Sequence, residues 1–338
     1  MSSSERILVV GPSWVGDMVM AQSLFISLKH RWPACSIDVL APEWSIPVLA
    51  RMPQVRNGIP MPLGHGQFNW SVRRRLGRSL AGQAYSRAIV IPRSFKAALV
   101  PFHAGIPVRT GYRGEMRYGL INDMRPLDKS VLTKTVQRFV ALGVARNTPL
   151  PPHSPAPALR VDPVKQAEVM QRLNLAGPAV AMMPGAEYGP AKCWPLEKFA
   201  EAARILGERG YKVWVLGSKK DAPAGDVIVA GSGGAAVNLC GETQLEEAID
   251  LLAASKAAIT NDSGLMHVAA AVDTRVIALY GSSTPDFTPP LTHDCTIHYL
   301  RLECSPCFKR ECPLGHLDCL NKIDVTRVIA DLPGQQAQ

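Results

Sequence analysis

The chain lacks any long apolar segment. No run reaches the 18 or so apolar residues that a membrane-spanning helix needs. The N-terminus also lacks the features of a signal peptide, because the apolar run from Ile7 to Val10 is short and ends at Gly11-Pro12. We therefore expect a cytoplasmic protein. With 338 residues, 47% of them hydrophobic and 19% charged, the sequence predicts two well-packed domains of ordinary size.

Acidic residues are scarce in the first half of the chain. Residues 1–155 carry 20 Lys+Arg against 7 Asp+Glu, whereas the remainder carries 17 against 21. The net charges are +13 and −4, which sum to the +9 of the whole chain. The basic half has neither a nucleic-acid motif nor interleaved aromatic residues. Its surface could face RNA, DNA or anionic lipid headgroups, or it could simply be solvated.

Prolines mark the boundary between these halves, with five of them in residues 147–157, a composition typical of a semi-rigid linker. Short apolar strands alternate with helical patterns on both sides. Strands are predicted at 7–10, 36–40, 88–91, 179–183, 212–216, 257–260 and 275–280, and helices at 17–30, 162–173, 195–209, 244–254 and 264–272. The alternation predicts an α/β protein with two Rossmann-like domains, residues 1–155 and 156–338, and a cleft between them.

The loop after the first strand lacks the usual phosphate-binding patterns. It has no G-x-G-x-x-G spacing, and Asp17 stands where a Walker loop would have its lysine. A carboxylate there would repel phosphate, but the helix dipole would keep it ionised at the carboxyl end of the strand. Asp17 is therefore either a general base that takes a proton from an attacking hydroxyl or a helix-capping residue.

Two loops in the second half do suit a phosphate. Residues 183–195 and 260–267 each follow an apolar strand and open a helix, whose first N–H groups are unpaired. In the first loop Lys192 would neutralise a diphosphate leaving group, unless it is an ordinary surface lysine. In the second, we expect Ser263, Gly264 and backbone N–H groups to bind, and we expect Asp262 to cap the helix in preference to orienting the loop N–H groups or pairing with Lys192. His267, one turn further on, is predicted to contact the ligand, although packing is the alternative.

Two further strand ends add weaker signals. Ser282 lies in a run of hydroxyl residues after the strand at 275–280, and Asp221 follows the strand at 212–216, where it could bind a ribose hydroxyl or an adenine edge. Because the carboxyl ends of parallel strands meet at one edge of a sheet, these four loops predict a single nucleotide site.

Four of the eight cysteines are clustered near the C-terminus, at Cys304, Cys307, Cys312 and Cys319, with His316 among them. The cluster could hold a structural zinc ion, but its spacing departs from paired C-x2-C motifs. Reduced packing thiols or a redox-sensitive clip are the alternatives, because disulfides are disfavoured in the cytoplasm. A catalytic metal is not expected there.

These motifs together resemble the bacterial ADP-heptose:lipopolysaccharide heptosyltransferases, over nearly the whole chain. The resemblance rests on Gly16-Asp17, on residues 184–195, on Asn261 to His267 and on residues 281–285. Residues 92–96 and 109–119 resemble the acceptor-binding half of heptosyltransferase II in particular, and the cysteine cluster resembles the tail of that subgroup.

The resemblance implies a GT-B fold and inverting, metal-independent transfer without a cofactor. Heptose would move from ADP-heptose to the 3-hydroxyl of the first heptose of the inner core. Asp17 would be the base and Lys192 would stabilise the departing ADP. The implied donor-binding residues are Gly185, Lys192, Trp194, Asp221, Asp262, Ser263, Gly264, His267 and Ser282. The implied acceptor-binding residues are Gly16, Lys96, Arg109, Arg113 and Arg117.

The basic first half would then meet phosphorylated heptosyl-Kdo2-lipid A, which implies peripheral contact with the cytoplasmic face of the inner membrane. Nucleic acid is not an expected partner. We expect this contact to involve Arg73, Arg74 and Arg75 as well as the acceptor-binding residues, although the three arginines could be an ordinary solvated helix face. The alternatives are heptosyltransferase I, a later core heptosyltransferase, a nucleotide-sugar epimerase or hydrolase, and a nucleotide-responsive binding module without turnover.

Overall fold

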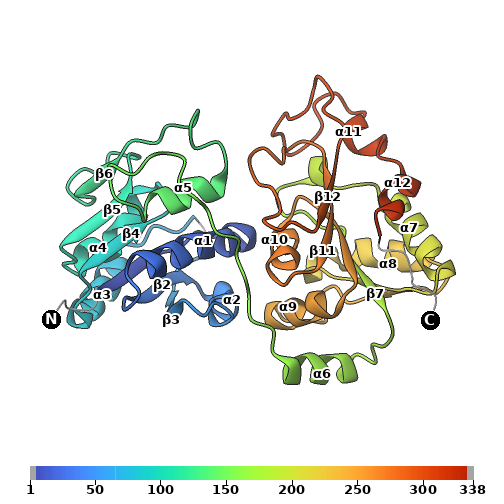
Figure 1. Ribbon diagram of the computed structural model, residues 1–338, viewed down its shortest axis with the longest axis horizontal. Coiled ribbons are helices and arrows are strands. Elements are labelled where there is room, and N and C mark those ends of the chain that lie inside the picture. The colour runs from blue at the N-terminus through green and yellow to red at the C-terminus, as the bar shows by residue number, and fades with distance from the viewer. Residues whose placement is uncertain (1–4, 65, 333–338) are drawn as a thin grey trace. The chain divides into compact units, whose positions relative to one another are not determined.

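The computed structural model describes residues 5–64 and 66–332, and the chain divides into two compact units. The first unit extends to Arg160 and the second begins at Val161. The elements of each unit can be followed in Figure 1. Each unit contains one six-stranded sheet in which the strand pairs are all parallel.

The first unit is built around the apolar strand β1, whose last four residues are buried. Its sheet has the order β3-β2-β1-β4-β5-β6. The strands are β1 (Arg6–Val10), β2 (Ser36–Pro42), β3 (Val55–Met61), β4 (Arg87–Val90), β5 (Val108–Tyr112) and β6 (Asp123–Arg125). The helices are α1 (Val15–Arg31), α2 (Ile46–Ala50), α3 (Trp70–Leu80), α4 (Leu99–His103) and α5 (Thr135–Ala141). Parallel strands need crossover connections, which these helices and loops provide.

The second unit repeats the same topology. Its sheet has the order β9-β8-β7-β10-β11-β12, which places its strands as in the first unit. The strands are β7 (Ala179–Met183), β8 (Lys212–Val215), β9 (Ala236–Asn238), β10 (Ala257–Asn261), β11 (Arg275–Tyr280) and β12 (Cys295–Tyr299). The helices are α6 (Pro163–Arg172), α7 (Leu196–Glu208), α8 (Ala222–Gly231), α9 (Leu245–Ala254), α10 (Gly264–Ala271), α11 (Asp318–Asn321) and α12 (Val325–Ala330). In this order the strand sequence reverses between β7 and β10, where ligands of such folds bind.

The central strands agree with the sequence prediction, because they are fully buried apolar runs. The strands at 179–183 and 275–280 have the predicted bounds. The sheet margins were not predicted. Strands β3, β6, β9 and β12 contain mainly half-exposed residues, so their sequences show no apolar run.

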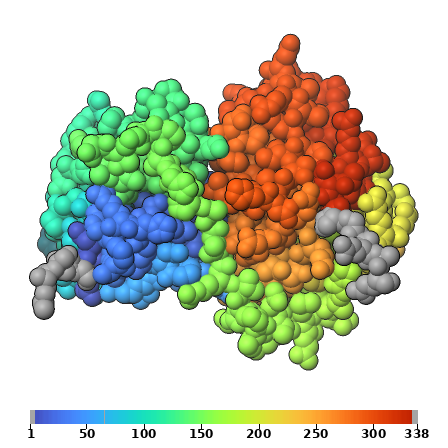
Figure 2. All heavy atoms as spheres, viewed as in Figure 1, coloured from blue at the N-terminus to red at the C-terminus, as the bar shows by residue number. Residues whose placement is uncertain are grey.

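The proline-rich segment is bound to the first unit and is not a free linker. The side chain of Gln22 on α1 donates to the Ala158 carbonyl at 2.7 Å and accepts from the Ala158 N–H at 3.0 Å. Further on, the Arg160 N–H donates to the Arg51 carbonyl at 2.8 Å. In Figure 2 this green segment runs over the blue surface of the N-terminal elements.

Hydrogen bonds within the second unit begin two residues later, at Asp162. Asp162 donates its N–H to the Asp250 carboxylate at 2.9 Å, and its own side chain caps α6. No helix in the described ranges combines the length and hydropathy that a bilayer crossing requires.

Candidate functional site

An ion pair joins the two predicted phosphate loops of the second unit. The Lys192 ammonium lies 2.5 Å from a carboxylate oxygen of Asp262, and the two side chains are 17% and 5% exposed. Lys192 follows β7 on a short 3₁₀ turn, and Asp262 directly follows β10, the neighbouring strand. The pair therefore stands at the carboxyl edge of the sheet, where the strand order reverses.

Asn261 holds these two loops together, a role that sequence reasoning did not assign. Its buried side-chain amide donates to the Pro184 carbonyl at 2.6 Å and its oxygen accepts from the Trp194 N–H at 3.0 Å. Both bonds cross from the end of β10 to the loop after β7. The only signal in the sequence was an amide at the end of an apolar strand.

The favoured prediction that Asp262 caps the helix is wrong. The N-cap of α10 is Ser263, which makes no side-chain capping bond. The second carboxylate oxygen of Asp262 accepts a long, 3.5 Å hydrogen bond from the Thr288 hydroxyl. The alternative prediction, that Asp262 pairs with Lys192, is the one that the structure supports.

His267 is neutral and lies inside the protein beside this pair. Burial lowers the pKa of His267 to about 4, with Lys192 acting in the same direction and Asp262 opposing it. A neutral imidazole binds a ligand oxygen through one N–H and cannot act as a second cation.

Three buried polar atoms around these loops have no hydrogen-bond partner among the described residues. They are His267 Nδ1, Ser282 Oγ and Ser283 Oγ. Buried polar atoms normally have a partner, so unsatisfied ones at a sheet edge indicate a place where a ligand or water completes the bonding. Ser263 and Gly264 are half-buried at the start of α10. The backbone N–H groups of a first helical turn have no partner within the helix, so they add hydrogen-bond donors at the same edge of the sheet.

Gly185 and Asp221 are in contact, which explains the glycine. A Cβ on Gly185 would lie 2.3 Å from a carboxylate oxygen of Asp221. The other oxygen of Asp221 accepts bonds of 2.8 Å from the N–H and the hydroxyl of Ser218, which closes the turn after β8. Asp221 is thus first a turn residue, and contact with a ribose stays a prediction.

The prediction that the Trp194 side chain binds the donor is wrong, because this side chain is buried in the core. Its side chain is 1% exposed and packs edge-to-face on Phe199 at 5.0 Å between ring centroids. Its indole N–H points to the Ile323 carbonyl at 3.4 Å. A large ring at the start of α7 anchors the loop in the core, a role that the motif alone could not distinguish from stacking on a base.

Asp17 lies in the first turn of α1, beyond the carboxyl end of β1. The helix begins after Trp14, which provides no side-chain cap, and Asp17 is half-buried while Gly16 is buried. A carboxylate in the first helical turn is favoured by the helix dipole. This position fits the predicted general base, and the N-cap itself is a different residue.

Three of the predicted basic surface residues are instead turned inward. Arg117 is fully buried and donates to the carbonyls of Tyr112, Pro92 and Ser94, and burial lowers its pKa to about 10. Arg109 donates to the carbonyls of Leu120, Ile106 and Gly119. Arg73 donates to the carbonyls of Phe68, Gln67 and Lys96 and is 5% exposed, so it is neither a solvated face nor an open contact.

These arginines satisfy loop carbonyls, and the structure does not offer Arg117 to an acceptor. The remaining predicted acceptor-binding cations are more open. Arg113 is exposed at the end of β5, and the half-buried Lys96 places its ammonium 3.4 Å from the Gln67 carbonyl.

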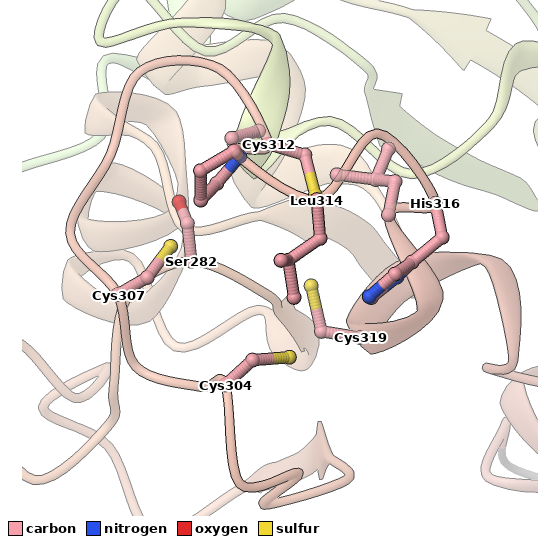
Figure 3. Close-up of a pocket in the computed structure, with 10 residues that line it drawn as sticks. Ser282, Cys304, Cys307, Cys312, Leu314, His316 and Cys319 are labelled. Carbon is pink, nitrogen blue, oxygen red and sulfur yellow. The ribbon is translucent and has the colours of Figure 1, made fainter.

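The cysteine cluster lines one pocket together with Ser282 and His316 (Figure 3). The thiols of Cys304 and Cys319 point into the same space, and Cys307 points toward Ser282. All eight cysteines are free thiols. Across residues 5–64 and 66–332, His, Cys, Asp and Glu side chains form no group ready to hold a metal ion, and a structural zinc ion at the cysteine cluster stays a prediction.

The cysteine segment, residues 304–319, is hydrogen-bonded to the loops after β7 and β11. The Ala191 N–H donates to the Arg310 carbonyl at 3.0 Å, and the Phe308 N–H donates to the Ser282 carbonyl at 2.7 Å. The Tyr188 hydroxyl donates to the Phe308 carbonyl at 2.6 Å, and the Tyr188 ring lies 5.2 Å from the Lys192 ammonium. The segment therefore helps to position the loop that carries Lys192.

The chain is similar in sequence and structure to known proteins. Residues 73–318 match the glycosyltransferase family 9 (heptosyltransferase) family. Lipopolysaccharide heptosyltransferase 2 of Salmonella typhimurium is 49% identical, with 97% of each chain covered. Lipopolysaccharide heptosyltransferase 1 of Pseudomonas aeruginosa is 25% identical, with 91% of this chain and 87% of the relative covered.

A solved structure extends the likeness to three dimensions. The structure of E. coli ADP-heptose LPS heptosyltransferase II superimposes with a TM-score of 0.85 at 45% identity, covering 96% of this chain and 97% of that one. The two Rossmann-like units of this chain thus form a GT-B fold.

Proposed function

The chain belongs to glycosyltransferase family 9, the heptosyltransferases, and from this premise we propose that it transfers L-glycero-D-manno-heptose from ADP-heptose to the first heptose of the lipopolysaccharide inner core. The 49% identity to heptosyltransferase 2 of Salmonella typhimurium, against 25% to heptosyltransferase 1 of Pseudomonas aeruginosa, supports this step over the preceding one.

The observation that carries the donor half of the proposal is the buried Lys192–Asp262 pair at the carboxyl edge of the second sheet. When the diphosphate binds, its negative charge would share the Lys192 ammonium with Asp262. The helix N-terminus at Ser263 and Gly264 adds N–H donors, and neutral His267 adds one more without adding charge. Lys192 then stabilises the charge that develops on ADP as the sugar–phosphate bond breaks.

Asp17 supplies the acceptor half. From the first turn of α1, its carboxylate would take the proton from the acceptor 3-hydroxyl as that oxygen attacks the anomeric carbon. Attack from the side opposite to the leaving ADP inverts the anomeric centre. Asp17 belongs to the first unit and Lys192 to the second.

No metal ion or organic cofactor is required in this scheme. In many glycosyl transfers a divalent cation offsets the charge of the departing nucleoside diphosphate. Here the Lys192 side chain and the α10 N-terminus would do so. Addition of a chelator is expected to leave the rate unchanged.

The proposed acceptor, phosphorylated heptosyl-Kdo2-lipid A, carries acyl chains, so the enzyme would work at the cytoplasmic face of the inner membrane as a peripheral protein. The net charge of +13 on residues 1–155 supports attraction to phosphate groups there. Exposed Arg113 and half-buried Lys96 are the cations through which we expect the acceptor to be held.

The test is ADP release from ADP-heptose with acceptors of defined length. Release that requires a Kdo-lipid A bearing one heptose supports the proposal. Release that requires a heptose-free acceptor would assign the first heptosyl transfer instead, and a longer acceptor would assign a later one. Turnover without any acceptor would contradict transferase activity and favour a hydrolase or an epimerase.

A further inference from the structure

The longest acid-free part of the chain lies in the first unit. Residues 44–114 contain 11 Lys and Arg and no Asp or Glu. Some of these cations are used internally, as Arg73 and Arg109 are. Arg74, Arg75 and Arg78 are exposed on α3, and no ion pair between described residues involves them.

Aromatic rings lie beside these cations and are unusually open to solvent. Phe68, Trp70 and Phe102 are 48%, 43% and 41% exposed. The centroids of Phe68 and Trp70 are 6.3 Å apart. His103 then packs edge-to-face between Trp70 at 5.4 Å and Phe102 at 5.3 Å, so the four rings form one continuous array.

The packing of α3 against α4 brings rings and arginines onto one surface. The helices pack closely at Gly77, where a Cβ would lie 2.6 Å from the Cβ of His103 (Figure 1). Trp70, Arg74 and Arg78 are spaced four residues apart, so they share one side of α3. Arg74 and Arg78 both lie close enough to His103 to lower its pKa.

We propose that this surface, formed by Phe68, Trp70, Arg74, Arg78 and Phe102, docks the protein on an anionic lipid bilayer. Exposed tryptophan and phenylalanine rings beside unpaired guanidinium groups match the chemistry of the membrane interface. There the rings enter the headgroup layer and the arginines bind lipid phosphates. This inference rests on the proposed function, because a lipid-anchored acceptor requires the enzyme to work at a membrane surface.

A single-stranded nucleic acid is the rival partner for a basic and aromatic surface, and the ring geometry disfavours it. Bases stack on free ring faces, whereas the rings here are packed edge-to-face through His103. A bilayer interface needs only the exposed ring edges and the charge. Nucleic-acid binding is therefore an outcome of the test and not the proposal.

The experiment is co-sedimentation with vesicles of phosphatidylethanolamine and phosphatidylglycerol in a 7:3 ratio, compared with neutral phosphatidylcholine vesicles. Wild type should bind the anionic vesicles, and binding should weaken with added salt. Arg74→Glu with Arg78→Glu should lower the partition coefficient by on the order of 100-fold. Trp70→Ala with Phe102→Ala should lower it roughly tenfold and remove the blue shift of tryptophan fluorescence.

Matched controls lie on the second unit. Lys165→Glu with Lys212→Glu makes the same charge change at two exposed lysines, and Val164→Ala with Val227→Ala removes exposed apolar side chains. Binding should survive both control pairs. Equal loss in the controls, or no loss in the α3 and α4 variants, would overturn the proposal, as would binding to poly(U) RNA in place of vesicles.

A second readout separates this inference from the proposed function. With a deacylated, water-soluble acceptor, both α3 and α4 variants should transfer heptose at the wild-type rate. If wild type transfers neither to that acceptor nor to its acylated form, the proposed function fails, whatever the vesicles show. If transfer is normal and vesicle binding is unchanged in the variants, only the docking surface is refuted.

Discussion

The two units share one strand order but equip the same edge of their sheets differently. In the second unit the loops after β7 and β10 carry a buried ion pair, helix α10 carries a neutral histidine, and the loop after β11 carries unsatisfied hydroxyls. In the first unit the corresponding edge carries a carboxylate in a helical first turn, and Arg117, which is bound to backbone carbonyls. The difference teaches that the topology determines where a ligand binds, whereas a few side chains determine whether that place attracts phosphate or a hydroxyl.

The largest effect is expected from removal of the Asp17 carboxylate in the first unit. Asp17→Asn should lower the transfer rate by about 10²- to 10⁴-fold, the usual contribution of a positioned general base. Binding of ADP should be unchanged, because the proposed donor site lies in the other unit. Calorimetric titration of ADP alongside a steady-state assay checks both parts, and a fully active variant would remove Asp17 from the mechanism.

The matching change in the second unit should affect both binding and rate. Lys192→Met is expected to lower the rate about 10²- to 10³-fold and to weaken ADP binding, because the developing negative charge loses its cation. Rate and ADP affinity are measured as for Asp17→Asn.

Lys192→Met should also lower the free energy of unfolding, since Asp262 is left buried without its partner. Lys192→Met with Asp262→Asn should be more stable than the Lys192 variant alone. The opposite order of stability in urea unfolding would mean that the two charges are not coupled.

The inward arginines distinguish a structural cation from a ligand-binding one. Arg117→Met should reduce the free energy of unfolding by about 4 kcal/mol, because it strands several buried carbonyls. The folded fraction should keep its acceptor KM. Arg113→Met, at an exposed cation nearby, should leave stability alone and raise the acceptor KM; a reversal of these two results would restore Arg117 as a binding residue.

The free energy of unfolding should depend on pH because of His267, which lies in the second unit. Its pKa of about 4 lies below the ordinary 6.5, so the unfolded chain binds the proton more readily. Stability is then complete above about pH 6.5 and falls as the pH drops toward 4, by about 1 kcal/mol at pH 5.5 and about 3 kcal/mol in full. Urea unfolding of His267→Gln should lack that dependence; an unchanged pH profile would show that another group causes it.

Sequence alone predicted the central parts of both sheets, because buried parallel strands such as 179–183 and 257–260 are continuous apolar runs. Half-exposed strands such as β12 could not be found by that signal. At the site, the loops were predicted from helix starts after strands. The direction in which a side chain points could not be predicted. Arg117 and Trp194 are residue types that often bind ligands, but both side chains are buried in the protein.

The covalent joint between the units is very short. Arg160 is held by Arg51 and Asp162 by Asp250, so one residue, Val161, separates the two bonded positions. Such a tether keeps one unit at a high effective concentration around the other. Inserting glycine and serine residues there would lower that concentration gradually with length, without altering either fold. If donor and acceptor bind to different units, as proposed, the length of this joint would set how often the two substrates meet.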